Sequence, residues 1–252
     1  MSEILVIDVG NTRAKWAIVG EQKVVQRGAV PTLELIASLP DILAKSASTI
    51  SWCSVVQMVS EPLSTALTQA GRAHHRLTCH DAPGLPFSYP KPEQVGQDRL
   101  ANAIGAQALV GAPAAVVDMG TATTFDLVSA KQGFIGGIIL PGLASMTDYL
   151  NEKVSMLPKL NPNELSLSPR IGRSTLEAMQ VGCARGYPSM IRGLLDGVRD
   201  EFAALGEPEP TVILTGGATR GVIREALAEY RAEPDLTLIG LAEAQRRRMT
   251  TR

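Results

Sequence analysis

Two short segments of this chain have nearly the same sequence, and each directly follows an apolar, β-rich run. The first is Ile7-Asp8-Val9-Gly10-Asn11-Thr12, and the second is Val117-Asp118-Met119-Gly120-Thr121-Ala122-Thr123-Thr124. Asp118 follows Asp8 by 110 residues. A pattern that recurs once at such a distance predicts a duplicated fold, in which each half ends a strand in the same kind of turn.

The residue types in both turns are those that a phosphate site needs. Glycine lets the backbone bend tightly and approach a phosphate without an intervening Cβ. A carboxylate repels a phosphate, so Asp8 and Asp118 make sense as direct or water-mediated ligands of an accompanying cation. Ordinary turn chemistry is the alternative, because Asp and Gly are common in turns. The side chains that can donate to phosphate oxygens are those of Asn11, Thr12, Thr121, Thr123 and Thr124.

Composition and charge narrow the class of protein. The chain has 252 residues, 45% of them hydrophobic, and carries a formal net charge of −1, which argues against a nucleic-acid surface. No stretch approaches 18 apolar residues and no basic leader precedes the first strand, so we expect no membrane partner and a cytoplasmic location. The basic run Arg246-Arg247-Arg248 is interpreted as a solvated helix end.

Hydrophobic spacing predicts alternating strands and helices. A segment with four prolines, residues 81–94, is expected to be irregular, and Gly186 and Pro188 should kink or split the long helix. We place the boundary between an N-terminal half, 1–113, and a C-terminal half, 114–252. The expected strands are 4–9, 14–19, 23–29, 49–56, 114–119, 123–128, 134–139, 211–214 and 236–239. The expected helices are 33–44, 61–70, 98–109, 143–153, 175–205 and 219–230.

Five motifs in order give the chain a resemblance to type III pantothenate kinases. The motifs are Asp8-Val9-Gly10-Asn11-Thr12, Gly96-Gln97-Asp98-Arg99, Asp118-Met119-Gly120-Thr121-Ala122-Thr123-Thr124, Gly136-Gly137-Ile138-Ile139-Leu140-Pro141-Gly142 and Leu214-Thr215-Gly216-Gly217. The resemblance spans residues 8–217. It implies an α/β, duplicated ribonuclease-H-like or actin-like ATPase fold, as in the acetate and sugar kinase, heat-shock chaperone and actin superfamily.

The same resemblance implies an activity and its cofactors. Members of the family are homodimers that phosphorylate pantothenate to 4′-phosphopantothenate, the first step of coenzyme A biosynthesis. They use ATP, Mg²⁺ and a monovalent cation, K⁺ or NH₄⁺. The expected activity is therefore that of a kinase, a transferase with an alcohol acceptor.

Asp98 matches the family's general base, which orients the acceptor hydroxyl and accepts its proton. The alternative is a helix N-terminal aspartate that only complements the macrodipole. Arg99 can bind a substrate carboxylate bidentately. The other implied pantothenate contacts are Tyr89, Gly96, Gln97 and Thr175, the last from the neighbouring subunit. Tyr89 could instead be a packing residue, and we expect Thr175 also to cap its helix.

For the nucleotide, the resemblance implies ATP contacts from Asp8, Val9, Gly10, Asn11, Thr12, Arg13, Ala14, Lys15, Thr121, Gly216 and Gly217. It also implies that Asp118 binds the monovalent cation, which leaves Asp8 as the expected partner of Mg²⁺, through water. The chain lacks a P-loop lysine motif, so a cation would offset phosphate charge that no such lysine meets. Each of these assignments has a structural alternative. Lys15 could be a solvated residue of the hairpin. Residues 215–217 could form an ordinary strand-to-helix turn, and residues 136–142 could serve only as a tight connector.

Two other functions remain open on the sequence alone. The first is a nucleotide-binding transcriptional accessory protein on the same scaffold. The second is an actin-like or chaperone-like ATPase that hydrolyses ATP without an alcohol acceptor. Retention of Asp98, Arg99 and both Asp-x-Gly turns favours the kinase.

Overall fold

The computed structural model describes residues 3–21, 23–46 and 49–250. Their contacts divide the chain into two compact units. Unit 1 comprises Met1–Gly111, Lys131–Ile135 and Asp235–Arg252, and unit 2 comprises Ala112–Ala130 and Gly136–Pro234. The units therefore differ from a division after residue 113, since two later segments pack with the first unit.

Unit 1 is built on a five-stranded sheet with the order β3-β2-β1-β4-β5. The central strand β1 is antiparallel to β2 and parallel to β4, which is in turn parallel to β5. The bounds are β1 Ile4–Val9, β2 Arg13–Gly20, β3 Lys23–Pro31, β4 Ile50–Ser54 and β5 His74–Arg76.

A second five-stranded sheet has the order β10-β9-β6-β7-β8. Its central strand β6 is antiparallel to β7 and parallel to β9, which is parallel to β10, so it repeats the topology of the first sheet. This repetition confirms the predicted duplication. The bounds are β6 Ala114–Met119, β7 Ala122–Ser129, β8 Gly133–Pro141, β9 Thr211–Thr215 and β10 Arg231–Ala232.

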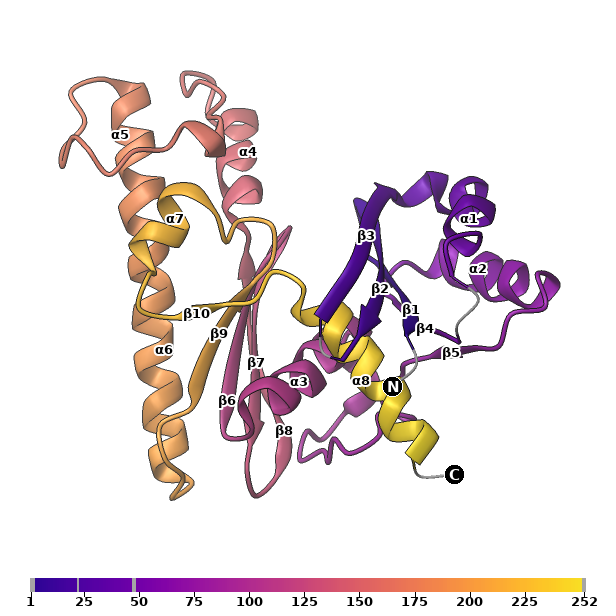
Figure 1. The fold of residues 1–252 in the computed structure, drawn as a ribbon. Coiled ribbons are helices and arrows are strands. Elements are labelled where there is room, and N and C mark those ends of the chain that lie inside the picture. The colour runs from indigo at the N-terminus through magenta and orange to yellow at the C-terminus, as the bar shows by residue number, and fades with distance from the viewer. Residues whose placement is uncertain (1–2, 22, 47–48, 251–252) are drawn as a thin grey trace. The chain divides into compact units, whose positions relative to one another are not determined.

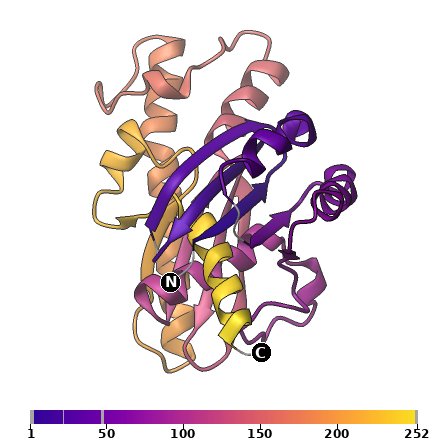
Figure 2. The ribbon, with the colours of Figure 1, turned by 45° about the vertical axis from the view of Figure 1, so that its right-hand side comes forward.

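Helices cover both faces of the first sheet (Figures 1 and 2). Strand alternation directs Leu5, Ile7 and Val9 to the face that packs against α1 (Leu35–Leu43) and α2 (Gln57–Gln69). The same alternation directs Asp8 to the opposite face. There, α3 (Gln97–Val110) and α8 (Leu236–Thr250) contact the strands.

Helices α3 and α8 cross at very short range. A Cβ built on Gly240 would lie 1.8 Å from the Ala101 carbonyl oxygen, and one on Gly105 would lie 2.8 Å from that of Leu236. Only glycine at these two positions allows the backbones this approach.

The expected strand at 236–239 is wrong, because these residues form the first turn of α8. Their apolar run is buried against α3, and a short apolar run does not distinguish a buried strand from a buried helix. The strand parallel to β9 is instead the short β10.

The three arginines of α8 are not a solvated helix end. The exposed fractions of the Arg246, Arg247 and Arg248 side chains are only 15%, 22% and 28%. Their guanidinium groups donate to unit 1 acceptors: the carbonyl oxygens of Val19, Gly20, Pro83 and Gly84, and the side chains of Gln107 and Asp81. The run therefore anchors the helix.

In unit 2, the long helix is interrupted near Gly186, where a kink or split is predicted, by a π-helical segment rather than by a break. Residues 175–204 form α5 (Thr175–Val181), a π-helical segment (Gly182–Gly186) and α6 (Tyr187–Ala204). The other helices are α4 (Leu143–Lys153) and α7 (Gly221–Ala226), and α7 is shorter than predicted. Among the described residues, no helix is long and apolar enough to cross a membrane.

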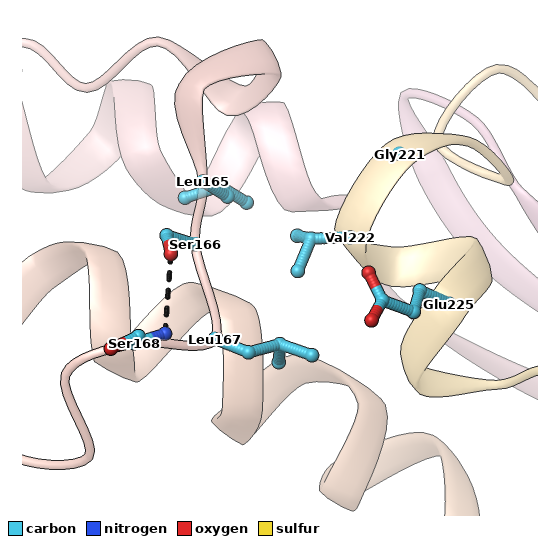
Figure 3. A pocket seen from close by; sticks show the side chains of 7 residues that line it. All are labelled: Leu165, Ser166, Leu167, Ser168, Gly221, Val222 and Glu225. Atoms are coloured by element: carbon cyan, nitrogen blue, oxygen red, sulfur yellow. Dashed lines mark hydrogen bonds between the residues drawn. The ribbon is translucent and has the colours of Figure 1, made fainter.

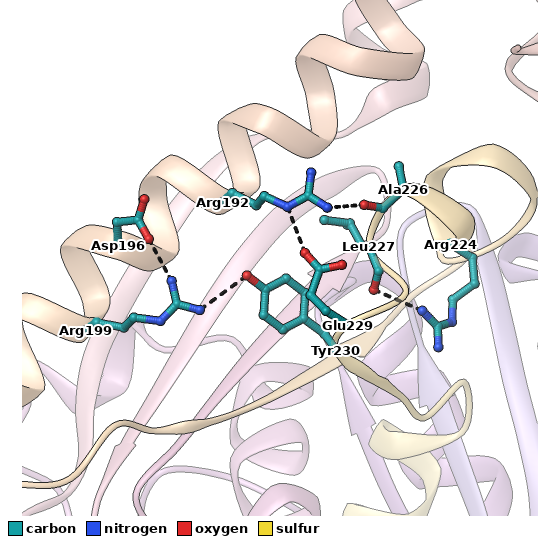
Figure 4. Close-up of polar contacts among 8 residues, drawn as sticks. All are labelled: Arg192, Asp196, Arg199, Arg224, Ala226, Leu227, Glu229 and Tyr230. Carbon is teal, nitrogen blue, oxygen red and sulfur yellow. Dashed lines mark hydrogen bonds and ion pairs between the residues drawn. The ribbon is translucent and has the colours of Figure 1, made fainter. Parts of the chain in front are cut away.

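Ion pairs attach the segment that follows α7 to α6 (Figure 4). Arg192 Nε donates to Glu229 at 2.7 Å, and another of its nitrogens donates to the Ala226 carbonyl oxygen. Arg199 pairs with Asp196 and donates to the Tyr230 hydroxyl. The exposed pairs contribute little individually, but together they fix the path of the chain from α7 to β10.

Replacing Gly240 by Ala should destabilise the protein by about 1–3 kcal/mol, because the new methyl group must displace α3. Gly197, in α6, provides the control, because a Cβ added there would meet nothing within 4 Å. Gly197→Ala should be neutral or stabilising by about 0.5–1 kcal/mol. Urea denaturation of both variants measures the difference; equal stabilities would contradict the close crossing.

Candidate active site

In unit 1, Asp8 ends the central strand as a nearly buried carboxylate. Its side chain is 8% exposed. Parallel pairing places Cys53 of β4 beside it, and the Cys53 thiol donates to Asp8 Oδ1 at 3.4 Å. Lys15 lies opposite Asp8 in the antiparallel register with β2. Asp8 therefore has a fixed orientation and a neighbouring cation on the adjacent strand.

The turn that follows β1 is closed by backbone and side-chain hydrogen bonds. Gly10 N donates to Arg13 O at 3.2 Å, and Thr32 Oγ1 donates to Gly10 O at 2.7 Å. Asn11 and Thr12 remain exposed at its tip. The turn is therefore fixed at its base and presents polar groups to solvent.

The equivalent turn in unit 2 is closed in a similar way. Gly120 N donates to Ala122 O at 3.0 Å, and Gly142 N donates to Thr121 O at 3.0 Å. Ser145 Oγ donates to the same Thr121 oxygen at 2.7 Å. A Cβ on Gly142 would lie 2.1 Å from Gly120 O, so the backbone between β8 and α4 packs directly on this turn.

Asp118 and the predicted adenosine motif come together within unit 2. Gly216 has φ +91°, and a Cβ on it would lie 2.4 Å from Asp118 Oδ1. Ala218 N donates to Met119 O at 2.9 Å, which ties the end of β9 to the end of β6. Both the positive φ and the close approach require glycine at position 216.

Thr123 does not present its hydroxyl as predicted. It is fully buried and shares a hydrogen bond with the Tyr187 hydroxyl. Burial raises the pKa of Tyr187, and the charge of Asp118 adds to that increase, whereas the hydrogen bond to Thr123 opposes it. Side chains along β7 alternate between the two faces of the sheet, and Thr123 lies on the buried face. Its hydroxyl therefore contacts the core and not the exposed surface of the turn.

Asp98 lies in the first turn of α3, where the helix dipole favours a carboxylate. Its Oδ1 accepts a hydrogen bond from Arg99 N at 2.8 Å, and a Cβ on Gly96 would lie only 2.5 Å from that oxygen. The carboxylate therefore folds back over Gly96, the residue that precedes the helix.

The charges of both Asp8 and Asp98 act on the buried Cys53 thiol. Burial raises its pKa well above 9.0, and the charges of Asp8 and then Asp98 raise it further. The thiol therefore lies within the fields of both aspartates. In the fold of unit 1, α3, which carries Asp98, contacts β4, in which Cys53 is paired with Asp8.

The carboxamide oxygen of Gln97 accepts two hydrogen bonds from other residues of the protein. Oε1 accepts from Ser54 N at 3.0 Å and from Arg76 Nε at 3.2 Å. A substrate contact through the rest of this side chain stays a prediction. Neither Ser54 nor Arg76 was among the residues predicted from sequence.

Phe134 is a third site residue that the sequence reasoning missed. The Arg99 guanidinium lies 5.7 Å from the Phe134 ring centroid, and the Tyr89 ring meets it edge-on at 6.1 Å. Backbone hydrogen bonds between Phe134 and the proline-rich segment fix this position, with Phe134 N donating to Pro86 O at 2.8 Å. Phe134 thus supports two of the predicted substrate contacts at once.

Thr175 borders an apolar cavity of about 410 Å³ in unit 2. It is the first residue of α5 rather than the cap, because Ser174 Oγ accepts the hydrogen bond from Glu177 N. The capping part of the Thr175 prediction is therefore wrong. The cavity is lined mainly by leucine and methionine side chains, with Cys183 and Tyr187.

A second hollow of about 630 Å³ lies beside α7, the helix that follows residues 215–217 (Figure 3). Leu165 and Leu167 from a loop face Val222 and Glu225 across it. Its size is in the range of small-molecule sites.

The raised pKa of Cys53 predicts a pH dependence of stability. Above about pH 9 the unfolded thiol ionises while the folded thiol stays protonated, so stability is lost as the pH rises. The free energy of unfolding should fall from about pH 8 to pH 10, and less steeply in Cys53→Ala. Cys79→Ala is the matched control, because Cys79 is a free and only partly buried cysteine. Equal slopes in the wild type and Cys53→Ala would contradict the assignment.

Comparison with known proteins shows the relationship. The sequence model of the type III pantothenate kinase family matches residues 4–197. A type III pantothenate kinase of Akkermansia muciniphila is 39% identical over 242 residues, covering 94% of this chain and 96% of the relative. That of Frankia alni is 34% identical, with coverage of 94% and 96%.

Solved structures share the fold at low sequence identity. A conserved Baf family protein of Campylobacter jejuni, described as a transcriptional activator, aligns with a TM-score of 0.64 at 19% identity, covering 98% of this chain and 99% of its own. A glucokinase of the ROK family from Streptomyces griseus aligns with a TM-score of 0.54 at 11% identity, covering 96% and 98%. These likenesses confirm the duplicated actin-like fold. The match to the family model and the full-length relatives together show that the chain belongs to the type III pantothenate kinase family.

Proposed function

We propose that this protein transfers the γ-phosphoryl group of ATP to the primary hydroxyl of pantothenate, giving 4′-phosphopantothenate, the first step of coenzyme A biosynthesis. The family relationship supports the substrate and reaction class. The observation that carries the chemistry is the placement of Asp98 in the first turn of α3, a helix that contacts β4, whose Cys53 thiol donates to Asp8.

Asp98 is the proposed general base. Phosphoryl transfer depends mainly on positioning and charge neutralisation, and a carboxylate orients the attacking hydroxyl and accepts its proton. The hydrogen bond from Arg99 N holds one Asp98 oxygen, and the helix N-terminus favours the charged form that a base needs.

Arg99 and Tyr89 are the proposed contacts to pantothenate. The Arg99 guanidinium can bind the pantothenate carboxylate with two parallel hydrogen bonds. Its cation–π contact with Phe134 orients it, and the same ring supports Tyr89. Gly96 contributes by leaving room for the Asp98 carboxylate.

For the nucleotide, unit 1 offers the turn after β1, with Asn11, Thr12 and Lys15 as proposed phosphate donors. Mg²⁺ is usually held by one or two carboxylates together with substrate phosphates and water. Asp8 fits that role as a fixed, nearly buried carboxylate. Because phosphates and water supply the other ligands, a Mg²⁺ site of this kind does not require a cluster of three protein side chains. Bound Mg²⁺ would neutralise charge on the phosphates.

Within unit 2, we propose that Thr121, Gly216 and Gly217 contact ATP and that Asp118 binds K⁺ or NH₄⁺. The close approach of Gly216 to Asp118 supports treating the two motifs as one site. We further propose a cytoplasmic homodimer, in which Thr175 contacts pantothenate bound to the neighbouring subunit. Exposed apolar side chains near the Thr175 cavity, including Tyr149, Met156 and Leu176, support that interface.

ADP release in the presence of Mg²⁺ should require pantothenate, and it should be faster in K⁺ than in Na⁺. Asp98→Asn should lower kcat by about 10²-fold or more, since general-base catalysis contributes at least that much. ATP binding, measured by calorimetry, should persist. Acceptor-independent ADP release would contradict the kinase assignment, and unchanged turnover of Asp98→Asn would contradict the role of Asp98.

Gly96→Ala should lower kcat by about tenfold, because the methyl group would displace the Asp98 carboxylate from its position. The backbone at Gly96, with φ −55°, is accessible to alanine, so the melting temperature should change little. Gly197→Ala is the matched control on a helix remote in sequence. Wild-type kcat in Gly96→Ala would show that the position of this carboxylate is not critical.

A further inference from the structure

Strand β4 extends beyond the end of its neighbour β5, and the Gln97 side chain takes the place of the missing backbone partner. Along the β4–β5 pair, Ile50 N donates to Ala73 O at 3.0 Å and Leu77 N donates to Trp52 O at 2.8 Å. Since strand amides alternate in direction, the next β4 amide on that side belongs to Ser54. β5 ends at Arg76, and Ser54 N donates to Gln97 Oε1 instead. The Gln97 carboxamide thus continues the ladder beyond the end of β5.

Arg76 fixes the same carboxamide from a second direction. Its Nε donates to Gln97 Oε1 at 3.2 Å, so both lone pairs of that oxygen have donors. Two further contacts hold Arg76 itself. Its Nη2 donates to Ser60 Oγ at 3.3 Å, and its guanidinium lies 5.1 Å from the centroid of the Trp52 ring. Trp52 is only 1% exposed, so the guanidinium rests on the core.

We propose that Gln97 and Arg76 are positioning residues that hold Asp98 in its catalytic place, an inference that rests on the proposed function. Gln97 is the first residue of α3 and Asp98 the second, so the hydrogen bonds of Gln97 fix the backbone that carries Asp98. We call the hydrogen bonds of Gln97 with Ser54 and Arg76 the clamp. The clamp attaches the start of α3 to β4, the strand in which the Cys53 thiol donates to Asp8.

The rest of α3 is secured independently of this clamp. Gly105 packs against α8, and the Thr237 hydroxyl donates to Asn102 Oδ1 at 2.7 Å. Loss of the clamp would therefore loosen the first turn of α3 without unfolding the helix. A displacement of about 1 Å in a reacting group can cost up to 10²-fold in rate, so turnover should respond more than stability does.

The test compares Gln97→Met, which keeps the size but removes the acceptor, with Gln97→Glu, which keeps an acceptor oxygen. Gln97→Met should lower kcat about tenfold, with KM for pantothenate and for ATP within about twofold of the wild type. Gln97→Glu should recover most of the loss, and Arg76→Met should resemble Gln97→Met. Gln94→Met, at an exposed glutamine just before the helix, is the matched control.

The same substitution in an Asp98→Asn background separates positioning from a general structural effect. With the base removed, Gln97→Met should cause no further fall in the residual rate. An equal fall in both backgrounds, a raised KM for pantothenate at unchanged kcat, or failure of Gln97→Glu to recover activity would overturn the inference. Absence of pantothenate-dependent turnover in the wild type would instead overturn the proposed function, and the inference with it.

Discussion

The close crossing of α3 and α8 is the constraint on which unit 1 depends. Two helix backbones approach so closely that the Cβ of any other residue at Gly240 would overlap a carbonyl oxygen. Both helices pack on one face of the sheet. Arginines of α8 then attach that helix to the end of β2, through Gly20 O, and to the loop that contains Asp81. This arrangement helps to place Asp98, because Asp98 lies in the first turn of the helix that α8 holds in position.

The duplication gives the two units the same framework but different chemistry at equivalent places. Asp8 is paired in register with Cys53, whose thiol donates to it, whereas Asp118 is paired with Thr215 and faces Gly216. One carboxylate is nearly buried and the other is partly accessible. These surroundings are consistent with proposed roles toward different cations, since ligand number and accessibility distinguish cation sites.

Patterns with a clear period or a motif could be predicted from the sequence. Both central strands and the hairpins after them are confirmed, and the long helix is irregular near Gly186, where it takes a π-helical form. The first turn of α8 was mistaken for a strand, because its burial against α3 is not visible in a short apolar run. Arg76, Phe134 and the buried state of Thr123 depend on contacts between segments distant in sequence, and the solvated interpretation of residues 246–248 failed for the same reason.

The path of the chain has a consequence for how the protein is made. Unit 1 includes Phe134 and all of α8, although the whole of unit 2 lies between residue 111 and α8 in the sequence. During synthesis, domains generally fold as units from the N-terminal side. Here the first unit still lacks the helix that supports α3 when unit 2 has already been translated. The unit that begins first is therefore completed last, and a nascent chain cannot hold Asp98 in its final position before α8 has emerged.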